Sequence, residues 1–413
     1  MRIKRRAAAI AAAAITAVSI AACGSSGTAA GSGGGSTTAS AIPVGVIGSY
    51  SGTEAAYLQG SDKVAEAWAD SVNAAGGISG HKIRLYVEDD NTDQATAIQD
   101  VKTLVEQDHV VAIVGDVSTS DTAWASYVQK MGIPVVGGDS IHTAFLTNPD
   151  FYAAGTDLVS GFYGVASLAK TNGPKFGVAY CAELDTCAAV VQLVDALGKP
   201  LGVTASYQTK VAATTPDFTA LCQSLKQAKV NSYDLALDQA TIKRAFSQCT
   251  SEGVTAPLVT LGDVDSSFLQ SPSYDGMQIV DSNYPFWDTA LPAAQQFHAA
   301  LKKYAPSVGA SSASPLTPIQ MQVWASGKLF QAAVAASGGG PVTAASVKKG
   351  LYALKNETLG GLSGPLNFVQ GKPSPVNCYF TYKIDSGKFV ALSGEKPVCA
   401  PAGLVSTVMA GLG

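Results

Sequence analysis

The sequence predicts an α/β protein made of doubly wound, mostly parallel sheets flanked by helices, arranged in two similar lobes. Residues 110–114 and 132–136 are short apolar runs rich in valine and isoleucine, as expected of strands buried on both faces of a parallel sheet. Such runs alternate with segments whose apolar residues recur at helical spacing. The alternation begins again near residue 157, which indicates two lobes rather than one large sheet.

The first lobe is expected to contain four strands with helices between them. The strands are predicted at residues 43–47, 81–87, 110–114 and 132–136. Val64, Trp68 and Val72 recur at helical spacing after the first strand, and glycines at 76 and 77 suit a left-handed helix end. Further helices are predicted around residues 98–105 and from the small polar residues 115–120 to about Lys130.

The second lobe repeats this alternation. Its strands are predicted at residues 175–180, 203–207, 234–237 and 258–261, and its helices around residues 165–168, 190–197 and 218–225. From Leu291 the pattern is helical again, through Trp324 to Phe330. Late strands are predicted at residues 364–368 and 378–382, and a polar turn before residues 389–392 predicts a terminal hairpin.

The N-terminus has the pattern of an export signal. Four basic residues within positions 2–6 precede an uncharged, mostly apolar stretch at 7–22, too short to span a membrane comfortably. The stretch ends in Ala-Ala-Cys-Gly, which resembles a bacterial lipobox, so residues 1–22 are expected to be a lipoprotein signal peptide and Cys23 the acylated N-terminus. An ordinary secretory signal is the alternative. Residues 23–40, rich in glycine and serine, are expected to form a flexible tether.

Composition agrees with an exported globular protein. Without residues 1–22 the chain has 23 basic and 31 acidic residues, a net charge of −8, and no basic stripe, so nucleic-acid binding is not expected. No later segment has about 18 continuous apolar residues, the minimum for a membrane helix. The predicted location is extracytoplasmic, lipid-anchored to the cell membrane.

The cysteines support the same compartment. Beside Cys23 there are six, and an even number in an exported chain favours three disulfides, with 15 possible pairings. Proximity along the chain favours Cys181–Cys187, Cys222–Cys249 and Cys378–Cys399. A metal site is the alternative, but no CxxC motif or nearby histidine supports it, and neither a metal nor another cofactor is expected.

Small polar residues follow two strands of the first lobe, at the point where each strand ends. Ser118, Thr119 and Ser120 follow the run at 110–114, and Asp139 and Ser140 follow the run at 132–136. Open α/β sheets bind ligands at the carboxyl ends of their strands, where helix N-termini offer free N–H groups to an anion. These two loops are therefore predicted to form a ligand cradle.

The chain resembles the type I periplasmic solute-binding proteins of the branched-chain amino-acid (Leu/Ile/Val) kind. The resemblance lies in the segment NAAGGISGHKI at 73–83, the acidic turn EDDNTD at 88–93 and GPLNF at 364–368. It implies a two-lobed fold with three hinge crossings, near Gly155, Tyr284 and Leu362. The implied lobes are residues 41–155 plus 285–362 and residues 156–284 plus 363–413.

The resemblance also implies ligand-binding residues. Thr119 and its neighbours Ser118 and Ser120 correspond to the hydroxyls that hold a solute carboxylate, although Thr119 could instead be a helix cap. In the second loop, the implied ligand contacts are Asp139, Ser140 and Ile141. Tyr57 corresponds to an aromatic residue that lies over the ligand. The second lobe contributes Gln239 and Asp263. Asp263 corresponds to an acid that pairs with an ammonium group.

The implied function is that of an extracytoplasmic substrate-binding protein of an ABC importer. It would trap a small solute, a branched-chain or other amino acid or a related amide, by hinge closure and deliver it to the permease, acting as a monomer. Asp116 and Asp139 depart from this pattern, because ionised carboxylates in both loops would repel a bound carboxylate unless they are paired or point away. A neutral amide, a polyol or a cationic solute is the alternative cargo.

Two other functions are alternatives. A ligand-sensing lipoprotein, presenting its closed form to a membrane receptor, needs the same clamp, so the sequence does not separate it from a transporter component. A secreted hydrolase is disfavoured, because residues 48–52 have Tyr50 where a nucleophile elbow needs serine, and no HExxH, P-loop or GxGxxG motif occurs. No catalytic residue is therefore predicted.

Overall fold

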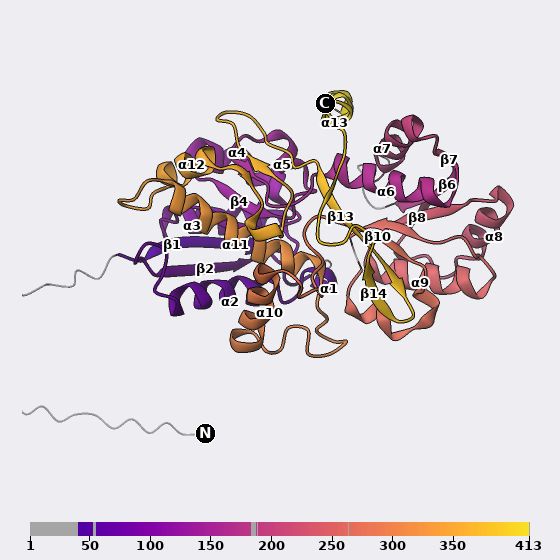
Figure 1. Ribbon diagram of the computed structural model, residues 1–413, viewed down its shortest axis with the longest axis horizontal. Coiled ribbons are helices and arrows are strands. Elements are labelled where there is room, and N and C mark those ends of the chain that lie inside the picture. Colours follow the sequence, from indigo (N-terminus) through magenta and orange to yellow (C-terminus); the bar gives the residue numbers. More distant parts are fainter. Residues whose placement is uncertain (1–39, 53–54, 183–186, 188, 263, 413) are drawn as a thin grey trace, which may run out of the picture. The chain divides into compact units, whose positions relative to one another are not determined.

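A computed structural model describes residues 40–52, 55–182, 187, 189–262 and 264–412 (Figure 1). The predicted signal peptide, Cys23 and all of the tether before Ser40 lie outside these residues. Within the described part of the chain, no helix has both the length and the apolar character that crossing a bilayer requires.

The first sheet consists of five parallel strands in the order β2-β1-β3-β4-β5. They are β1 (Ile42–Gly48), β2 (Ile83–Asp89), β3 (Ile113–Asp116), β4 (Val135–Gly138) and β5 (Phe151–Tyr152). The predicted parallel sheet is confirmed, but β2 begins two residues later than expected, and β3 and β4 each begin three residues later. Residues 132–134 precede β4 because Pro134 has no N–H for the ladder. In β3, regular pairing with β1 starts only at Ile113.

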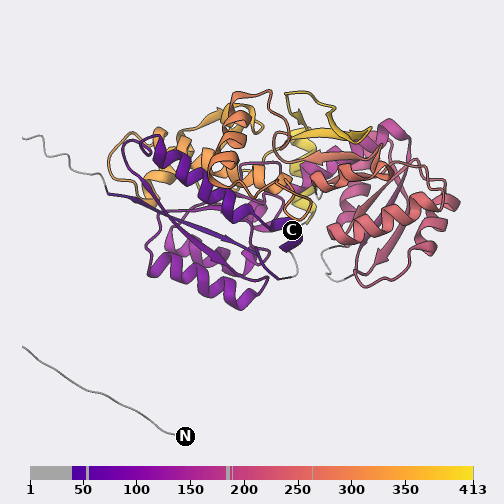
Figure 2. The ribbon, with the colours of Figure 1, turned by 90° about the horizontal axis from the view of Figure 1, so that it is seen from below.

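Helices cover both faces of this sheet (Figure 2). On one face lie α3 (Gln94–Glu106) and α4 (Asp121–Met131); on the other lie α2 (Ser61–Ala74), α10 (Pro292–Tyr304) and α11 (Pro318–Ala336). α10 and α11 follow α2 by more than 200 residues, and α11 packs against both β3 and β4. A Cβ added at Gly327 would lie 2.5 Å from the Trp68 ring, so α11 and α2 approach closely because of this glycine.

The helix predicted around Val64 is interrupted. The chain forms α1 (Ala55–Leu58), then turns at Gly60, which has φ 77°, before α2 begins. Only glycine adopts this left-handed conformation at no steric cost, so the break is local in origin. The first part of the chain also contains α5 (Thr143–Thr147), and α12 (Ala344–Ala353) packs against α11.

The second group of strands begins with the parallel set β7-β6-β8: β6 (Lys175–Cys181), β7 (Thr204–Val211) and β8 (Ser232–Ala236). A bridge from Tyr233 to Leu258 leads to β9 (Val259–Leu261), which pairs in parallel with β10 (Gln278–Asp281). β13 (Cys378–Asp385) is antiparallel to β10 and forms the predicted hairpin with β14 (Lys388–Ala391). Strand β10 was not predicted, since its four residues are too short to give a periodic pattern.

Helices of the second group are α6 (Leu158–Asn172), α7 (Ala189–Gly198), α8 (Thr219–Ala228), α9 (Gln239–Ser251) and α13 (Ala402–Leu412). α6 packs on β9, β10 and β13, and α13 contacts α6 and α7. The prediction missed α9, α12 and α13. Short elements complete the chain: β11 (Lys355–Glu357), β12 (Leu366–Asn367), β15 (Val398–Cys399), and the 3₁₀ turns η2 (Lys199–Leu201), η3 (Ser266–Gln270), η4 (Pro272–Tyr274) and η5 (Leu359–Gly361).

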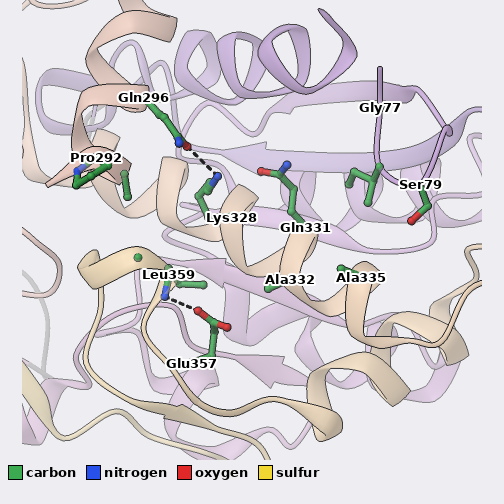
Figure 3. Close-up of a pocket in the computed structure, with 13 residues that line it drawn as sticks. Gly77, Ser79, Pro292, Gln296, Lys328, Gln331, Ala332, Ala335, Glu357 and Leu359 are labelled. Carbon is green, nitrogen blue, oxygen red and sulfur yellow. Dashed lines mark hydrogen bonds between the residues drawn. The ribbon is translucent and has the colours of Figure 1, made fainter. Parts of the chain in front are cut away.

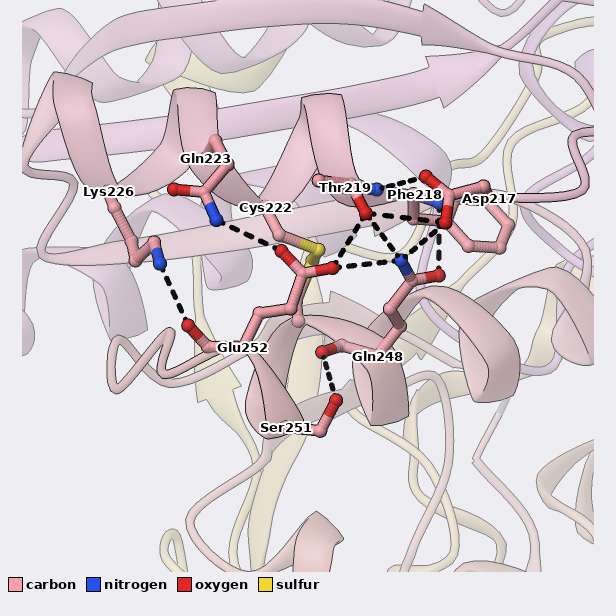
Figure 4. The surroundings of a disulfide bond; sticks show 10 residues. Asp217, Phe218, Thr219, Cys222, Gln223, Lys226, Gln248, Ser251 and Glu252 are labelled. Atoms are coloured by element: carbon pink, nitrogen blue, oxygen red, sulfur yellow. Dashed lines mark hydrogen bonds between the residues drawn. A yellow bond between two sulfur atoms is a disulfide. The ribbon is translucent and has the colours of Figure 1, made fainter.

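All three predicted disulfides are present: Cys181–Cys187, Cys222–Cys249 and Cys378–Cys399. The second joins α8 to α9 and lies beside a hydrogen-bonded cluster at the ends of the same helices (Figure 4). In that cluster the Glu252 carboxylate accepts hydrogen bonds from the side chains of Thr219, Gln248 and Gln223 at 2.9–3.1 Å. The link between α8 and α9 is therefore both covalent and polar.

The three segments predicted as crossings lie next to one another. The backbone N–H of Thr156 donates to Ser282 O at 3.2 Å, and that of Tyr284 donates to Leu362 O at 2.9 Å. Shortly after Tyr284, the half-buried Trp287 packs against two aromatic rings, with centroids 4.4 Å from Tyr382 and 4.5 Å from Phe389.

Candidate functional site

The candidate site lies at the carboxyl ends of β1, β3 and β4. In the strand order 2-1-3-4-5 the chain moves outward from β1 in both directions, so the connections after β1 and β3 leave toward opposite faces. The crevice at such a topological switch point is where doubly wound sheets bind ligands. Ser49 directly follows β1, and residues 117–120 connect β3 to α4.

Two hydroxyl groups meet at this switch point. Ser49 Oγ and Thr119 Oγ1 are 3.1 Å apart, and the backbone N–H of Thr119 also donates to Ser49 Oγ at 3.1 Å. Ser49 is buried and Thr119 is exposed. The N-cap of α4 is Ser120 rather than Thr119, and no side chain caps this helix. The Thr119 hydroxyl is therefore not occupied as a helix cap.

The other residues of this loop have structural partners. The Ser118 hydroxyl is buried and donates to Asp90 Oδ2 at 2.5 Å, while the N–H of Ser120 donates to Ser118 Oγ at 3.2 Å. Asp90 lies after β2, so these bonds tie the connections after β2 and β3 together below Thr119. Ser49 and Asp90 were not among the predicted site residues, although Ser49 carries the same signal as Thr119: a small hydroxyl residue directly after a buried strand.

The second predicted loop, after β4, is bound tightly to the first. The N–H of Asp139 donates to Asp116 O at 2.8 Å, and Ser140 Oγ accepts the N–H of Gly155 at 3.3 Å. Asp139 and Ser140 are buried, and Ile141 is half-buried. The structure thus brings Ser118, Thr119, Ser120, Asp139 and Ser140 into one connected region.

Asp116 and Asp139 are withdrawn from the surface of this region. Asp116 is 0% exposed, and its Oδ1 accepts the N–H of Ser118 at 3.0 Å. Asp139 Oδ2 lies 3.6 Å from Nε2 of His142. Burial, followed by the charge of Asp121, raises the pKa of Asp116 well above its usual range. Asp116 therefore holds a proton more readily than an exposed aspartate does, and Asp139 is paired with a base.

The remaining predicted residues come from other elements. Tyr57 is half-buried on α1, and its hydroxyl oxygen would lie 3.7 Å from a Cβ added at Gly262. Gly262 follows β9 and precedes Asp263, which lies outside the described residues. Gln239 is buried at the start of α9 and accepts a hydrogen bond from Lys243 at 3.5 Å.

A separate pocket of about 680 Å³ lies elsewhere, between α10, α11 and the turn at residues 77–79 (Figure 3). Lys328 Nζ projects into it and donates to Gln296 Oε1 at 3.1 Å, and burial lowers the pKa of this lysine. A neighbouring pocket of about 540 Å³ shares Gln296, Lys328 and Gln331. The turn at 77–79 precedes β2, so the pocket is at the amino end of that strand, opposite to the cradle.

No group of three metal-ligating side chains occurs among the residues that the structure describes. The polar groups at the switch point are hydroxyls and backbone N–H groups, with buried acids and one histidine beneath them.

The sequence profile of the periplasmic binding protein family matches residues 41–388. The chain belongs to this family. Its members bind solutes and are not enzymes, and the parallel sheets flanked by helices are the type I form of their fold.

Two solved structures of periplasmic binding proteins share this fold. The branched chain amino acid ABC transporter protein from Thermus thermophilus, with bound valine, has a TM-score of 0.77 at 13% identity, covering 90% of this chain and 99% of that one. The fatty acid ABC transporter substrate-binding protein from Thermomonospora curvata has a TM-score of 0.73 at 20% identity, covering 89% and 94%.

A sequence relative is described as an amino acid binding protein, from Pseudomonas aeruginosa. It is 38% identical over 87 residues, which are 21% of this chain. The match spans only 23% of that relative's length, so it supports the family rather than a particular ligand for this periplasmic binding protein.

Proposed function

We propose that this protein captures a small solute bearing a carboxylate group and delivers it to an ABC permease. The observation that carries the proposal is the meeting of Ser49 and Thr119 hydroxyls, 3.1 Å apart, at the switch point of the first sheet. The relatives named for valine and for fatty acids differ in their ligands' tails, but both ligands carry a carboxylate. The carboxylate is therefore expected to bind at the switch point, where hydroxyl and N–H groups can donate hydrogen bonds to an anion.

The donors suit a carboxylate for a physical reason. Thr119 and Ser49 hydroxyls can each rotate to donate, and α4 is an 11-residue helix whose first N–H groups have no intrahelical acceptors. Hydrogen bonds to an ionised acceptor are roughly twice as strong as neutral ones. The exposed Thr119 hydroxyl is the group that a solute reaches first.

The acids in the two loops do not contradict this ligand. Asp116 is fully buried with a raised pKa, and Asp139 faces His142. Since neither side chain is presented at the surface as an unpaired charge, a carboxylate at Thr119 meets little repulsion. This favours a carboxylate over the neutral or cationic cargo that the sequence left open.

Closure of two lobes over the solute completes the proposal. We assign residues 41–155 plus 285–362 to one lobe and residues 156–284 plus 363–413 to the other. The packing of α11 on β3 and β4, and of α10 on α2, supports this division. Tyr57 would cover the solute from the first lobe, while Gln239 and Asp263 would contact it from the second; Asp263 would select amino acids through their ammonium group.

A lipid anchor would keep the protein near a permease in the membrane. The basic residues at 2–6, the apolar stretch and Cys23 support a lipid-anchored form outside the cytoplasm. A sensor that presents the closed form to a receptor would use the same site, and a transport assay separates the two functions. Solute uptake that depends on this protein and on an ABC permease is the expected result.

A thermal-shift screen of amino acids, fatty acids, amides, polyols and polyamines tests the ligand class. A solute at 100 times its Kd should stabilise the protein by about 2.7 kcal/mol. Thr119→Ala should weaken binding of the best carboxylate about tenfold, whereas Thr119→Ser, which keeps the hydroxyl, should bind nearly as wild type. Stabilisation by polyamines or polyols alone, or an unchanged Thr119→Ala variant, would contradict the proposed site.

A further inference from the structure

One imidazole connects the two loops of the cradle. His142 Nδ1 lies 3.2 Å from Asp121 Oδ2, and its Nε2 lies 3.6 Å from Asp139 Oδ2. Asp121 is the first residue of α4, two residues after Thr119, and Asp139 directly follows β4. The side chains of Asp121 and Asp139 are only 4% and 7% exposed, so this bridge is largely out of water.

His142 is also the local source of positive charge. The charged and titratable groups facing it are Asp121 on α4, Asp139 after β4 and Asp116 at the end of β3. Among the described residues, no lysine or arginine forms an ion pair with any of these three acids. Burial alone would lower the pKa of His142, but the charges of Asp121 and Asp139 outweigh it and raise the pKa to about 10.

The loop that carries His142 is hydrogen-bonded to the end of β3. The N–H of His142 donates to Asp139 O at 3.1 Å, and the N–H of Asp139 donates to Asp116 O at 2.8 Å. Residues 139–142 thus form a tight turn against the end of β3. A neutral side chain at 142 would leave two buried carboxylates facing each other, which is costly unless one of them takes up a proton or the loops separate.

We propose that His142 is a positioning residue: as an imidazolium it clamps the start of α4 to the loop after β4 and neutralises the acids beneath the cradle, so that the cradle accepts a carboxylate. The inference rests on the proposed function, because it explains why acids in both loops are compatible with an anionic solute. His142 does not have to touch the solute.

The first test compares each carboxylate with its neutral amide. Calorimetric titration at pH 7.5 would use L-leucine and L-leucinamide, and hexanoate and hexanamide, with wild type, His142→Gln, His142→Lys and the matched control His81→Gln. His142→Gln should weaken binding of the carboxylates at least tenfold, about 1.4 kcal/mol, and of the amides less than twofold. His142→Lys should recover most of the loss. Equal losses for acid and amide, or no recovery by lysine, would overturn the inference.

A second test needs no solute. In the unliganded wild-type protein at pH 8, ¹⁵N NMR of the His142 ring should show both nitrogens protonated. A neutral ring at this pH would overturn the inference. If wild type binds none of the four probes, the carboxylate proposal fails for these solutes, and the NMR result alone decides whether His142 is the imidazolium clamp.

The pH dependence of stability has a defined sign. The pKa of His142 is raised from 6.5 to about 10 in the folded state. The contribution of this residue to the free energy of unfolding is therefore complete below pH 6.5 and is lost as the pH rises through 10. The difference in melting temperature between wild type and His142→Gln should therefore shrink between pH 7 and pH 10. A difference that does not change over this range would contradict the clamp.

Discussion

The side-chain amide of Asn283 donates a hydrogen bond of 2.8 Å to the backbone oxygen of Ala154, 129 residues earlier in the chain. The same amide donates to Leu362 O at 3.1 Å, and Asn283 is 1% exposed. One side chain therefore joins the three segments assigned as crossings. Leu362 O also accepts the backbone N–H of Tyr284, so the carbonyl that depends more on Asn283 is that of Ala154.

Replacing Asn283 tests how much this junction stabilises the protein. Asn283→Ala removes the side-chain donor from the buried Ala154 carbonyl and leaves Leu362 O with only the N–H of Tyr284, so we expect a loss of about 1–3 kcal/mol in the free energy of unfolding. Urea denaturation followed by circular dichroism measures it. Asn367→Ala removes two exposed hydrogen bonds to Asn356, which water can replace, and should cost less than about 1 kcal/mol. Similar effects of the two substitutions would show that the junction is not a stabilising element.

Gly138 determines how closely the two cradle loops approach. Its φ is 140°, and a Cβ there would lie 2.0 Å from Asp116 O. Gly138→Ala should therefore push β4 away from β3, lower the melting temperature and weaken solute binding at Thr119. Gly132→Ala is the matched control, since Gly132 also has a positive φ, 72°, but no neighbouring atom within 4 Å of the added Cβ. Equal binding by the two variants would contradict this role of Gly138.

Asp263 should discriminate between amino acids and simple carboxylates. Asp263→Asn removes the negative charge proposed to meet an ammonium group, so binding of L-leucine should weaken about tenfold or more while binding of hexanoate stays the same or improves. Isothermal titration with both solutes measures the two affinities. Asp275→Asn serves as a control acid in the same half of the chain. Parallel losses for both solutes would assign Asp263 a structural role.

A buried acid in β8 predicts an unusual pH dependence. Burial raises the pKa of Asp234 from 3.8 to about 7, so the folded state binds its proton more tightly, and this acid costs stability progressively as pH rises from 4 to 7. Asp234→Asn should raise the melting temperature at pH 8 more than at pH 4.5. Asp217→Asn should change the melting temperature by about the same amount at both pH values, because Thr219 holds the pKa of this exposed acid below 3.8 and its contribution to stability is lost only below that pH. Calorimetry of each variant and of the wild type at the two pH values measures these changes in melting temperature.

Each disulfide should stabilise the folded protein by an amount that increases with the length of the loop it closes. Cys222–Cys249 spans 27 residues and Cys181–Cys187 spans 6. The chain-entropy model gives about 3.5 kcal/mol for the longer loop and about 2 kcal/mol for the shorter. Paired alanine substitutions should follow this order in denaturant unfolding, the first pair being the more damaging. The opposite order would mean that native packing around α8 and α9 compensates for the lost cross-link.

The sequence predicted the parts of the fold that have strong periodic patterns. The parallel strands β1, β3 and β4, the β13–β14 hairpin and the three disulfides were all expected, because continuous apolar runs, a polar turn and cysteine proximity are local signals. Helix α9 and strand β10 were missed. The apolar face of α9 is defined by residues such as Ile242 and Phe246 set among polar neighbours. Strand β10 has four residues and pairs with β9 before it and with β13 about 100 residues later.

At the candidate site, the sequence identified the loops but not their internal bonds. Thr119 and Asp139 could be selected because they follow buried strands. The bonds inside the site depend on how loops 20–30 residues apart meet in space. Ser118 donates to Asp90, and His142 faces both Asp121 and Asp139. The repulsion expected from Asp116 and Asp139 was reasonable from residue type alone, and their burial and pairing remove it.

Trp287, in its aromatic cluster, is an intrinsic fluorescent probe of the region where the crossings meet. Trp68, Trp124 and Trp324 are at most 2% exposed and packed in the core, so their emission should barely respond to hinge bending. Trp287 is half-buried against Tyr382 and Phe389, three residues after Tyr284. Bending at the crossings would alter its contact with these rings and with solvent, and intrinsic fluorescence would then follow solute capture in real time without any attached dye.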